Sequence, residues 1–254
     1  MVSVVEFDAI YAIWLREAKV FIREKERIAS SIISPLLWLF VFSVGIGNTV
    51  DMQNISYQSF VFPGIMIMSM LFTAVFYGLY IIWDRKLDFL KEVLVAPASR
   101  SSIFLGKALG GMTNTLVQAA VLLVIGAFFI LPISILQLAY LIPLLVLIAF
   151  SMVNLGLIIG SNLRSEEGFG LASNVVIWPL FFFSGALFSV ENLPPILKDI
   201  TALDPITYAV DALRTVLLGS GAFPLSTDIG VLMAFAAVTG VLGIISFGHL
   251  QQVK

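Results

Sequence analysis

The stretch that decides the fold runs from Ala108 to Leu163: ALGGMTNTLVQAAVLLVIGAFFILPISILQLAYLIPLLVLIAFSMVNLGLIIGSNL. None of its 56 residues is Asp, Glu, Lys or Arg. A helix crosses a hydrocarbon core of about 30 Å with roughly 20 apolar residues, so this stretch is too long for one span. The segment Leu131-Pro132-Ile133-Ser134 provides a natural break. The sequence therefore predicts two consecutive transmembrane helices, at 108–131 and 138–161.

Charged residues are also missing from four other stretches, 28–50, 52–83, 168–190 and 229–253, each with room for one span. The six predicted spans cover residues 29–48, 60–83, 108–131, 138–161, 168–189 and 229–250. A large soluble helical protein would need a polar face on most of its helices, and these segments lack one. The predicted fold class is therefore an all-α integral membrane protein, with a single transmembrane domain over residues 1–254.

The composition excludes several other classes of protein. Hydrophobic residues make up 59% of the 254-residue chain and charged residues only 12%, about half the share of a soluble domain. A disordered chain would be far more polar, and the net charge of −2 leaves no basic excess to hold nucleic acid. Cysteine is absent and there is one histidine, so we expect neither a disulfide nor a metal site.

The distribution of Lys and Arg predicts the orientation. Twelve of the 14 lie in the N-terminal segment, in the loop after the second span, after the fourth span, or at the C-terminus. By the positive-inside rule these parts face the cytoplasm, so both termini are predicted to be cytoplasmic. The predicted divisions are a cytoplasmic segment (1–27), spans one to five (28–190), an outer segment (191–228), and span six with the tail (229–254).

Two cytoplasmic segments have the pattern of amphipathic helices. Near the N-terminus, Phe7, Ile10 and Trp14 recur at helical spacing, which predicts a helix lying in the headgroup layer rather than packed on a soluble domain. In the loop 84–107, leucines recur at the same spacing before Ala96-Pro97, which predicts a short helix over 86–95. Such a charged helix suits docking of a soluble partner, and a solvated loop is the alternative.

The outer segment has a similar pattern. Asp204 can cap a helix that begins at Pro205, and Gly219 can end that helix. One face of this helix is apolar, and Thr207, Asp211 and Arg214 share the opposite face. A shorter helix is predicted before it. We expect the pair to lie on the outer leaflet or to dip into it, because backbone at that depth must be hydrogen-bonded.

The spans lack the groups that would power transport. They contain no acidic or basic residue except His249 at the end of the last, whereas ion-coupled carriers usually need such groups within the membrane. The pair Gly106-Lys107 has no upstream glycine of a P-loop, so the chain has no nucleotide site. No catalytic residue is predicted. We therefore expect the energy for uphill transport to come from another subunit.

Small and aromatic residues complete the analysis of the spans. Gly156 and Gly160 form a small-xxx-small pair, for which packing within the chain is favoured over a dimer contact. Phe181, Phe182 and Phe183 in the fifth span are candidates for the lining of a substrate pathway, although lipid contact or core packing is the default for such residues.

Two stretches of the chain carry motifs of a known family. The cytoplasmic stretch DRKLDFLKEVLVAPASRSSIFLGK, residues 84–107, resembles the loop of the permeases of type-2 ATP-binding-cassette (ABC) exporters. The matching residues there are Arg85, Leu90, Leu94, Pro97, Ser99, Arg100, Gly106 and Lys107. The outer stretch SGALFSVENLPPILKDITALDPITYAVDALR, residues 184–214, resembles its outer signature, with Asp204 where Asn is common. The matching outer residues are Ser184, Gly185, Phe188, Leu193, Pro194, Pro205, Thr207, Tyr208, Asp211 and Arg214. The segments SPLLWLFVFSVGIG and FPGIMIM look like the drug-exporter branch.

The resemblance implies a six-span permease that forms a homodimer in the membrane lipid and pairs with cytoplasmic ABC ATPase subunits, which would bind ATP and Mg. It also implies that the N-terminal helix and the helix at 86–95 contact the ATPase. The expected coupling residues are Arg85, Leu87, Asp88, Leu90, Lys91, Glu92 and Arg100. Outer re-entrant helices at 194–203 and 205–218 would cap the pathway. Their expected key residues are Pro194, Asp204, Pro205, Tyr208, Asp211 and Arg214.

The predicted function is export of a hydrophobic or amphipathic substrate, a drug or a lipid, by alternating access. The chain itself would be a permease without enzymatic activity. A permease for lipid-linked polysaccharide is the chief alternative, and an ion-coupled secondary carrier or a membrane scaffold for a soluble enzyme are the others.

Overall fold

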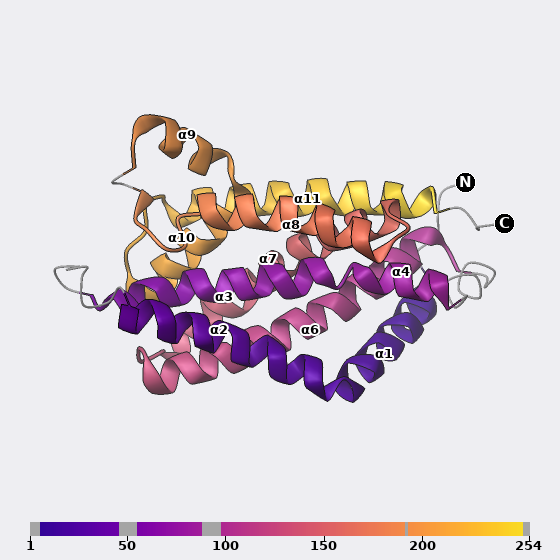
Figure 1. Ribbon diagram of the computed structural model, residues 1–254, viewed down its shortest axis with the longest axis horizontal. Helices are drawn as coiled ribbons and strands as arrows, with labels where there is room; N and C mark the ends of the chain where they lie inside the picture. The colour runs from indigo at the N-terminus through magenta and orange to yellow at the C-terminus, as the bar shows by residue number, and fades with distance from the viewer. Residues whose placement is uncertain (1–5, 46–54, 88–97, 191–192, 251–254) are drawn as a thin grey trace.

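The chain folds into a bundle of long helices (Figure 1). The computed structural model describes residues 6–45, 55–87, 98–190 and 193–250, and these ranges contain helices and no strand. The helices are α1 (Phe7–Arg23), α2 (Lys25–Gly45), α3 (Tyr57–Phe76), α4 (Leu79–Lys86), α6 (Arg100–Phe129), α7 (Ile135–Asn162), α8 (Glu166–Phe183), α9 (Pro195–Leu203), α10 (Pro205–Leu218) and α11 (Leu225–Gly248). The predicted all-helical class is therefore confirmed.

Serine residues fix where several of the long helices begin. The side chains of Ser56, Ser99 and Ser165 each accept the backbone N–H of the residue three positions on. Ser134 does the same for Gln137, whose side chain bonds back to the Ser134 N–H, forming a capping box. These bonds satisfy N–H groups that have no partner inside the helix. The loop that contains Pro132 thus ends in a defined start for α7.

In the described ranges, four helical stretches are long and apolar enough to cross a membrane: Tyr57–Lys86, Arg100–Phe129, Ile135–Asn162 and Leu225–Gly248. They cover the predicted spans two, three, four and six, with α6 beginning at Arg100 rather than at 108. The predicted spans 29–48 and 168–189 overlap α2 and α8. Because α2 begins with charged residues and α8 with two glutamates, the apolar parts of both are shorter. The count of six spans stays a prediction.

The second predicted span is not one continuous helix. A turn at Tyr77–Gly78 separates α3 from α4. At this turn the backbone of Gly78 lies directly against Gly156 of α7, and a Cβ atom on Gly78 would overlap the Gly156 carbonyl oxygen. Gly160 has the same relation to the Gly78 carbonyl. The pair Gly156 and Gly160 therefore serves packing within the chain, as favoured by the sequence.

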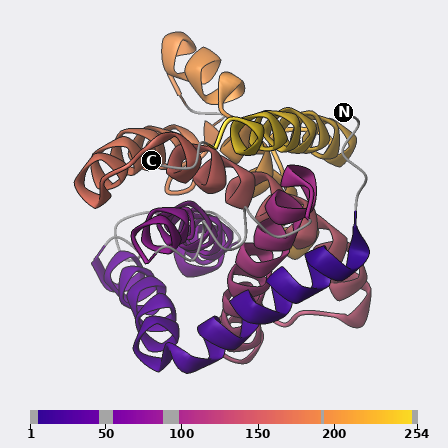
Figure 2. The ribbon, with the colours of Figure 1, turned by 90° about the vertical axis from the view of Figure 1, so that its right-hand side faces the viewer.

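Helix α3 forms the centre of the bundle, with α2, α6, α7, α8 and α10 packed around it. Its side chains Met66, Met70 and Leu71 are fully buried. Helix α1 crosses the outside of α6 at an angle (Figure 2). Burial of α1 is one-sided, since Ile10 is buried while Phe7, Tyr11 and Ile22 are exposed. Part of the predicted apolar face thus packs on α6, and part remains free to contact lipid.

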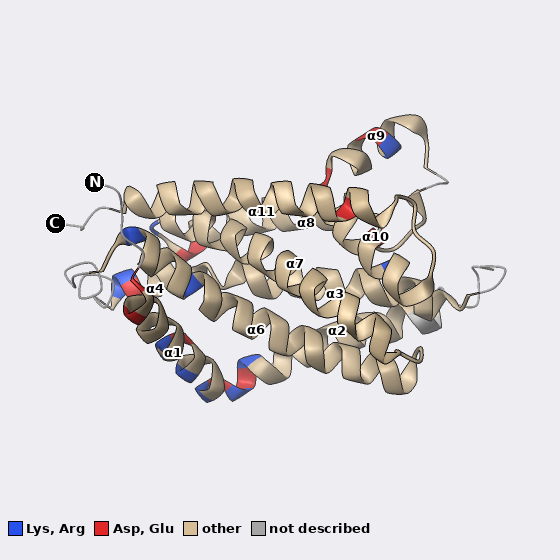
Figure 3. Cartoon of the chain, turned by 180° about the vertical axis from the view of Figure 1, so that it is seen from behind, with Lys and Arg blue, Asp and Glu red and all other residues tan. Residues whose placement is uncertain are grey.

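The two ends of the bundle differ in charge. Acidic and basic residues concentrate on α1, on α4 and at the adjoining end of α6 (Figure 3). We call this the charged end. The opposite end is formed by α9, α10 and the start of α11, and α9 stands away from the bundle (Figure 1). By the positive-inside rule, the charged end is the end predicted to face the cytoplasm.

Candidate functional site

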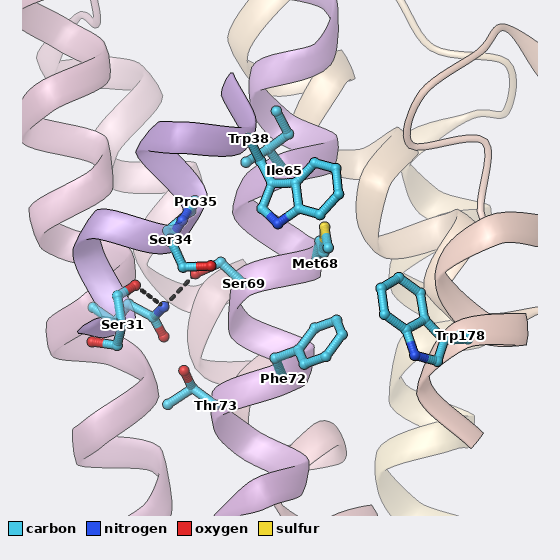
Figure 4. A pocket seen from close by; sticks show the side chains of 11 residues that line it. Ser31, Ser34, Pro35, Trp38, Ile65, Met68, Ser69, Phe72, Thr73 and Trp178 are labelled. Carbon is cyan, nitrogen blue, oxygen red and sulfur yellow. Dashed lines mark hydrogen bonds between the residues drawn. The ribbon is translucent and has the colours of Figure 1, made fainter. Parts of the chain in front are cut away.

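A pocket of about 290 Å³ opens among α2, α3, α6 and α8 in the apolar part of the bundle (Figure 4). Its lining residues are Ser31, Ser34, Pro35, Trp38, Ile65, Met68, Ser69, Phe72, Thr73, Gln118 and Trp178. In the described part of the chain, none of the lining side chains is charged. The pocket volume is at the lower end of the range for small-molecule sites.

A glutamine and a proline shape the polar side of this pocket. Pro35 lies inside α2 and has no N–H, so the carbonyl group of Ser31 loses its helical partner. The Gln118 side chain of α6 donates to that carbonyl at 2.7 Å, and it also donates to the Ser69 hydroxyl of α3. Gln118 therefore joins three helices at one point. Its Oε1 atom is buried without a hydrogen-bond partner, so the amide retains one acceptor.

The other side of the pocket is aromatic. Phe72 and Trp178 meet edge to face with ring centroids 5.4 Å apart, and Trp38 lies across the pocket from them (Figure 4). Hydroxyl groups of Ser34 and Thr73 line the same space. Aromatic faces with a few uncharged polar groups suit a ligand that has an apolar or aromatic body and a small neutral polar group. The same pocket offers no cation for a phosphate group.

The three phenylalanines that the sequence suggests for the pathway lie beside this pocket rather than in its lining. Phe181 is buried in the core. Phe182 is half exposed and stacks on Trp178, with ring centroids 5.5 Å apart. Phe183 is also partly exposed. A role for these residues in the pathway stays a prediction, and Trp178, on the preceding turn, is the α8 residue that the structure places in the pocket.

At the charged end, four charged side chains from three helices form a buried cluster, which we call the ionic cluster: Arg16, Glu17, Asp84 and Lys107. The Lys107 ammonium donates to Glu17 at 3.0 Å and to Asp84. Arg16 pairs with Glu17 at 2.7 Å and with Asp84 at 2.8 Å. Lys107, Glu17 and Asp84 are each at most 3% exposed. The Arg16 side chain is partly exposed at the edge of the cluster, and together with Lys107 it balances the two carboxylates, which makes burial of Glu17, Asp84 and Lys107 tolerable.

Two tyrosines extend the ionic cluster along α4. The Tyr77 hydroxyl donates to Glu17 at 2.8 Å, and the Tyr80 hydroxyl donates to Glu24. Burial opposes ionisation of Glu17, but the Lys107 ammonium, the Tyr77 hydroxyl and Arg16 together hold the pKa of that carboxyl below its ordinary value. The contact of α1 with α4 and α6 is therefore complete at neutral pH and weakens when acid protonates Glu17.

The expected coupling residues fall partly outside the described residues, where Asp88, Leu90, Lys91 and Glu92 lie. Arg85 lies at the end of α4 and donates to the carbonyl oxygens of Leu163 and Ser161 at the end of α7. Leu87 is exposed. Arg100 is the first residue of α6. Arg85 thus joins the end of α4 to the end of α7, and in the sequence α4 ends before and α6 begins after the segment where the coupling helix is expected.

At the opposite end, the polar face predicted for α10 is buried rather than exposed. Arg214 is 6% exposed, lies over the Phe60 ring at 3.8 Å, and donates to the carbonyl oxygens of Gly185 and Ala186 at 2.9 Å. Burial lowers the pKa of Arg214 to about 10, so it stays charged at neutral pH. Asp211 accepts backbone N–H groups of the loop after α10. These residues fasten α10 to α3, to the α8–α9 connection and to the start of α11.

The expected helix ends occur in this segment. Asp204 accepts the Ile206 N–H at 2.8 Å at the start of α10, and Gly219 ends that helix with a positive φ of 73°. Tyr208 donates to the Ala202 carbonyl of α9 at 2.8 Å. Pro194 caps the start of α9, and Pro205 is the first residue of α10. Re-entry of this segment into a membrane stays a prediction.

The sequence did not identify Glu17, Lys107 and Gln118 as members of sites. Glu17 lies in the segment predicted as an interfacial helix, and Lys107 enters the sequence-based prediction only as part of a motif. The available signal for Lys107 was its place just before a long charge-free stretch, since a cation at that depth needs a partner. Gln118 lies inside the charge-free stretch itself. The hint of its partner in the sequence was Pro35 in a neighbouring span, because a proline leaves the Ser31 carbonyl group without its helical donor.

Comparison with known proteins supports a transport role. The ABC-2 type transporter family matches residues 8–218. The inner membrane transport permease YadH of Escherichia coli (strain K12) is 29% identical over 235 residues, which cover 89% of this chain and 90% of that protein. Nodulation protein J of Rhizobium meliloti (strain 1021) is 26% identical over 214 residues, 83% of this chain and 81% of that protein. Nodulation protein J of Rhizobium leguminosarum bv. viciae is 24% identical over 234 residues, 89% of each.

Proposed function

Because the chain belongs to the ABC-2 type transporter family, we propose that it is the membrane subunit of an ATP-driven exporter of neutral amphipathic molecules. The subunit has the apolar helices of a membrane permease. In this proposal the cytoplasmic ABC ATPase binds ATP and Mg, and the permease forms a homodimer. The permease alternates between access from the cytoplasm and access from the outside.

The pocket among α2, α3, α6 and α8 supports this choice of substrate. Trp38, Phe72 and Trp178 offer aromatic surface to an apolar body, and Ser34 and Thr73 offer hydroxyl groups to a small polar group. A lipid-linked polysaccharide carries phosphate groups, which proteins usually bind with Arg, Lys or helix N-termini. The described lining offers no Arg or Lys, which favours a drug-like or neutral lipid substrate over that alternative.

The ionic cluster supports a route for coupling. It joins α1 and α6 to α4, and α4 ends directly before the segment where the coupling helix is expected. Movement of the ATPase would pass through this segment to α4, and from there to α3, which lines the pocket. We place Arg85, Leu87, Asp88, Leu90, Lys91, Glu92 and Arg100 at the ATPase contact.

The proposed topology has six spans, with α2 and α8 as the first and the fifth and with the charged end in the cytoplasm. The chain contains no cysteine, so single introduced cysteines report the side of the membrane directly. We expect Lys198→Cys on exposed α9 to react with a membrane-impermeant maleimide added to intact cells, and Glu167→Cys at the start of α8 to be protected. Labelling of both or of neither from outside would contradict the topology.

Transport in vesicles tests the function. Proteoliposomes with the permease and its ABC ATPase are expected to accumulate a neutral fluorescent amphiphile when ATP is added on the ATPase side, and vesicles with the permease alone are not. Reversing the charges of Asp88, Lys91 and Glu92 should abolish accumulation and weaken ATPase assembly. Accumulation driven by an ion gradient without the ATPase would establish a secondary carrier instead. A complex that hydrolyses ATP but moves no tested amphiphile would favour the alternative in which the chain is a membrane scaffold for a soluble enzyme.

Trp178→Ala links this transport to the pocket. Removing the indole ring takes away the contact with Phe72 and a large part of the aromatic wall. Loss of about 1.5–3 kcal/mol of apolar contact weakens apparent substrate affinity roughly 10- to 100-fold. Leu171→Ala on the same helix is the matched control, because Leu171 is exposed and outside the pocket lining. Equal effects of both substitutions on the substrate concentration at half-maximal uptake would exclude the pocket from substrate binding.

A further inference from the structure

Asp228 is a buried carboxyl group that the proposed transport route does not use. It lies in the first turn of α11 and is 0% exposed. Within the described part of the chain, neither carboxyl oxygen has a hydrogen-bond partner. The first turn of a helix carries free N–H groups, but none of them donates to this side chain. An ionised carboxylate in such a place would lose its hydration without any compensation, which costs far more than burial of the neutral acid.

Among the residues that the structure describes, no Lys or Arg forms an ion pair with Asp228. From α10, Asp211 and Tyr208 are close enough to interact with it electrostatically. Both oxygens of Asp211 accept backbone N–H groups, from Ala222 and Phe223 at 2.8 Å each, which is the arrangement of an ionised carboxylate. The Tyr208 hydroxyl donates to the Ala202 carbonyl. A second ionised carboxylate beside Asp211 would add repulsion between like charges.

The other neighbouring elements do not change this balance. Helix α7 contains a single titratable residue, Tyr140, and α6 has its two cations, Arg100 and Lys107, at the charged end. On α10, Arg214 is directed to Phe60, Gly185 and Ala186. The titratable and charged residues on the helices packed against α11 are therefore Tyr140 from α7, Arg100 and Lys107 from α6, and Tyr208, Asp211, Arg214 and the capping residue Asp204 from α10.

We define the cap as α10 together with residues 219–224, the loop that Asp211 holds. We propose that Asp228 is a proton-binding site beneath this cap, protonated while the cap is closed and ionised when the cap opens to water. On opening, the O–H bond of the carboxyl group breaks, the proton passes to solvent water, and the carboxylate is hydrated. The site is distinct from the substrate pocket. The proposal depends on the proposed function in one respect only, which is the side of the membrane that receives the proton.

The proposal has a defined sign. The closed cap holds one proton more than the open cap, so acid favours the closed form and a rise in pH favours opening. For one proton, the ratio of open to closed molecules rises by up to about tenfold per pH unit. In an exporter, an acidic exterior would thus hold the exit shut, and each opening would release a proton to the outside.

Thiol labelling of the purified full-length permease in detergent tests this proposal. Ala212 is fully buried and lies one helical turn after Tyr208 on the same face of α10, so a cysteine at that position reacts with maleimide only when the cap opens. Ser220→Cys is exposed and provides the reference rate at each pH. We expect the rate for Ala212→Cys, divided by the reference rate, to rise severalfold between acidic and mildly alkaline pH. Adding Asp228→Asn should make this ratio low and independent of pH.

The labelling rate of the Ala212→Cys thiol is measured with and without Asp228→Asn. Because the thiol is the same in both proteins, the effect of pH on its ionisation cancels. Burial also raises the pKa of Asp204, to about 7, and Asp204→Asn is therefore the matched control, because asparagine keeps the helix cap but does not titrate. An unchanged pH dependence in Asp228→Asn, or its loss in Asp204→Asn alone, would overturn the proposal. Infrared spectra give a second measurement. To remove the contribution of Asp204, the spectra are compared in the Asp204→Asn background, where a protonated carboxyl band must be present and must disappear when Asp228→Asn is added. Neither measurement requires ATP or transport.

Discussion

Replacing Lys107 by methionine is expected to detach α1 from the bundle. Methionine matches the length and apolar character of the lysine stem but leaves Glu17 and Asp84 buried, with Arg16 as the one cation paired with them among the described residues. Removing one partner from a buried ionic network costs about 3–5 kcal/mol, because the remaining charge has lost its hydration without compensation. At roughly 2–4 °C per kcal/mol, thermal unfolding in detergent should shift downward by about 6–20 °C.

Two further variants make this prediction specific to the ionic cluster. Lys19→Met removes the same charge from an exposed position on α1 and should leave the unfolding temperature nearly unchanged. Adding Glu17→Gln to Lys107→Met removes the uncompensated carboxylate and should restore part of the loss. Limited proteolysis should cut α1 faster in Lys107→Met. If Lys107→Met and Lys19→Met unfold at the same temperature, the ionic cluster does not stabilise the attachment of α1.

Replacing Gly78 by valine is expected to disrupt the packing of α4 on α7. A Cβ atom on Gly78 would overlap the backbone carbonyl of Gly156, which has no flexible end that can move aside. Overpacking usually costs about 1–3 kcal/mol, and a clash with backbone from both helices is at the upper end or beyond. The shift would also separate Arg85 from the carbonyl groups of α7. We therefore expect severe loss of folded protein.

The chain provides a matched control for this substitution. Gly170 in α8 has nothing within 4 Å of its Cβ position, so Gly170→Val should be tolerated with no more than the small penalty of a β-branched residue in a helix. The measurement is the yield of monodisperse protein after detergent extraction, together with its thermal unfolding. Comparable yields for Gly78→Val and Gly170→Val would show that α4 and α7 do not need their close approach.

Much of the fold could be predicted because the decisive signals are local. A charge-free run longer than about 20 residues predicts a helix of membrane length, and among the described residues four of the six predicted spans fall in such helices. Asp204 and Gly219 fix the two ends of α10 through their own conformational preferences. The amphipathic pattern around Phe7 predicted a helix within the segment 1–27, where α1 lies. The turn at Tyr77–Gly78 escaped prediction, because a single glycine in an apolar run is compatible with a continuous helix.

The candidate sites could be predicted less well, because they depend on contacts between distant segments. Glu17 and Lys107 are separated by 90 positions, and only the crossing of α1 over α6 brings them together. Gln118 finds the Ser31 carbonyl for the same reason, 87 positions away. Periodicity assigned Asp211 and Arg214 to a polar face, but it could not show that this face packs against other polar groups inside the protein.

The sequence alone determined that this protein is helical, apolar over membrane-length segments, and charged mainly at one end. Those properties follow from side-chain hydropathy and helix capping, which act within a few turns. Tertiary structure alone decided which charges are buried together and which helices line the pocket. It also placed Asp228 beneath the cap without a partner. The reason is that the cost of burying a polar group depends on which groups the fold brings within hydrogen-bonding distance.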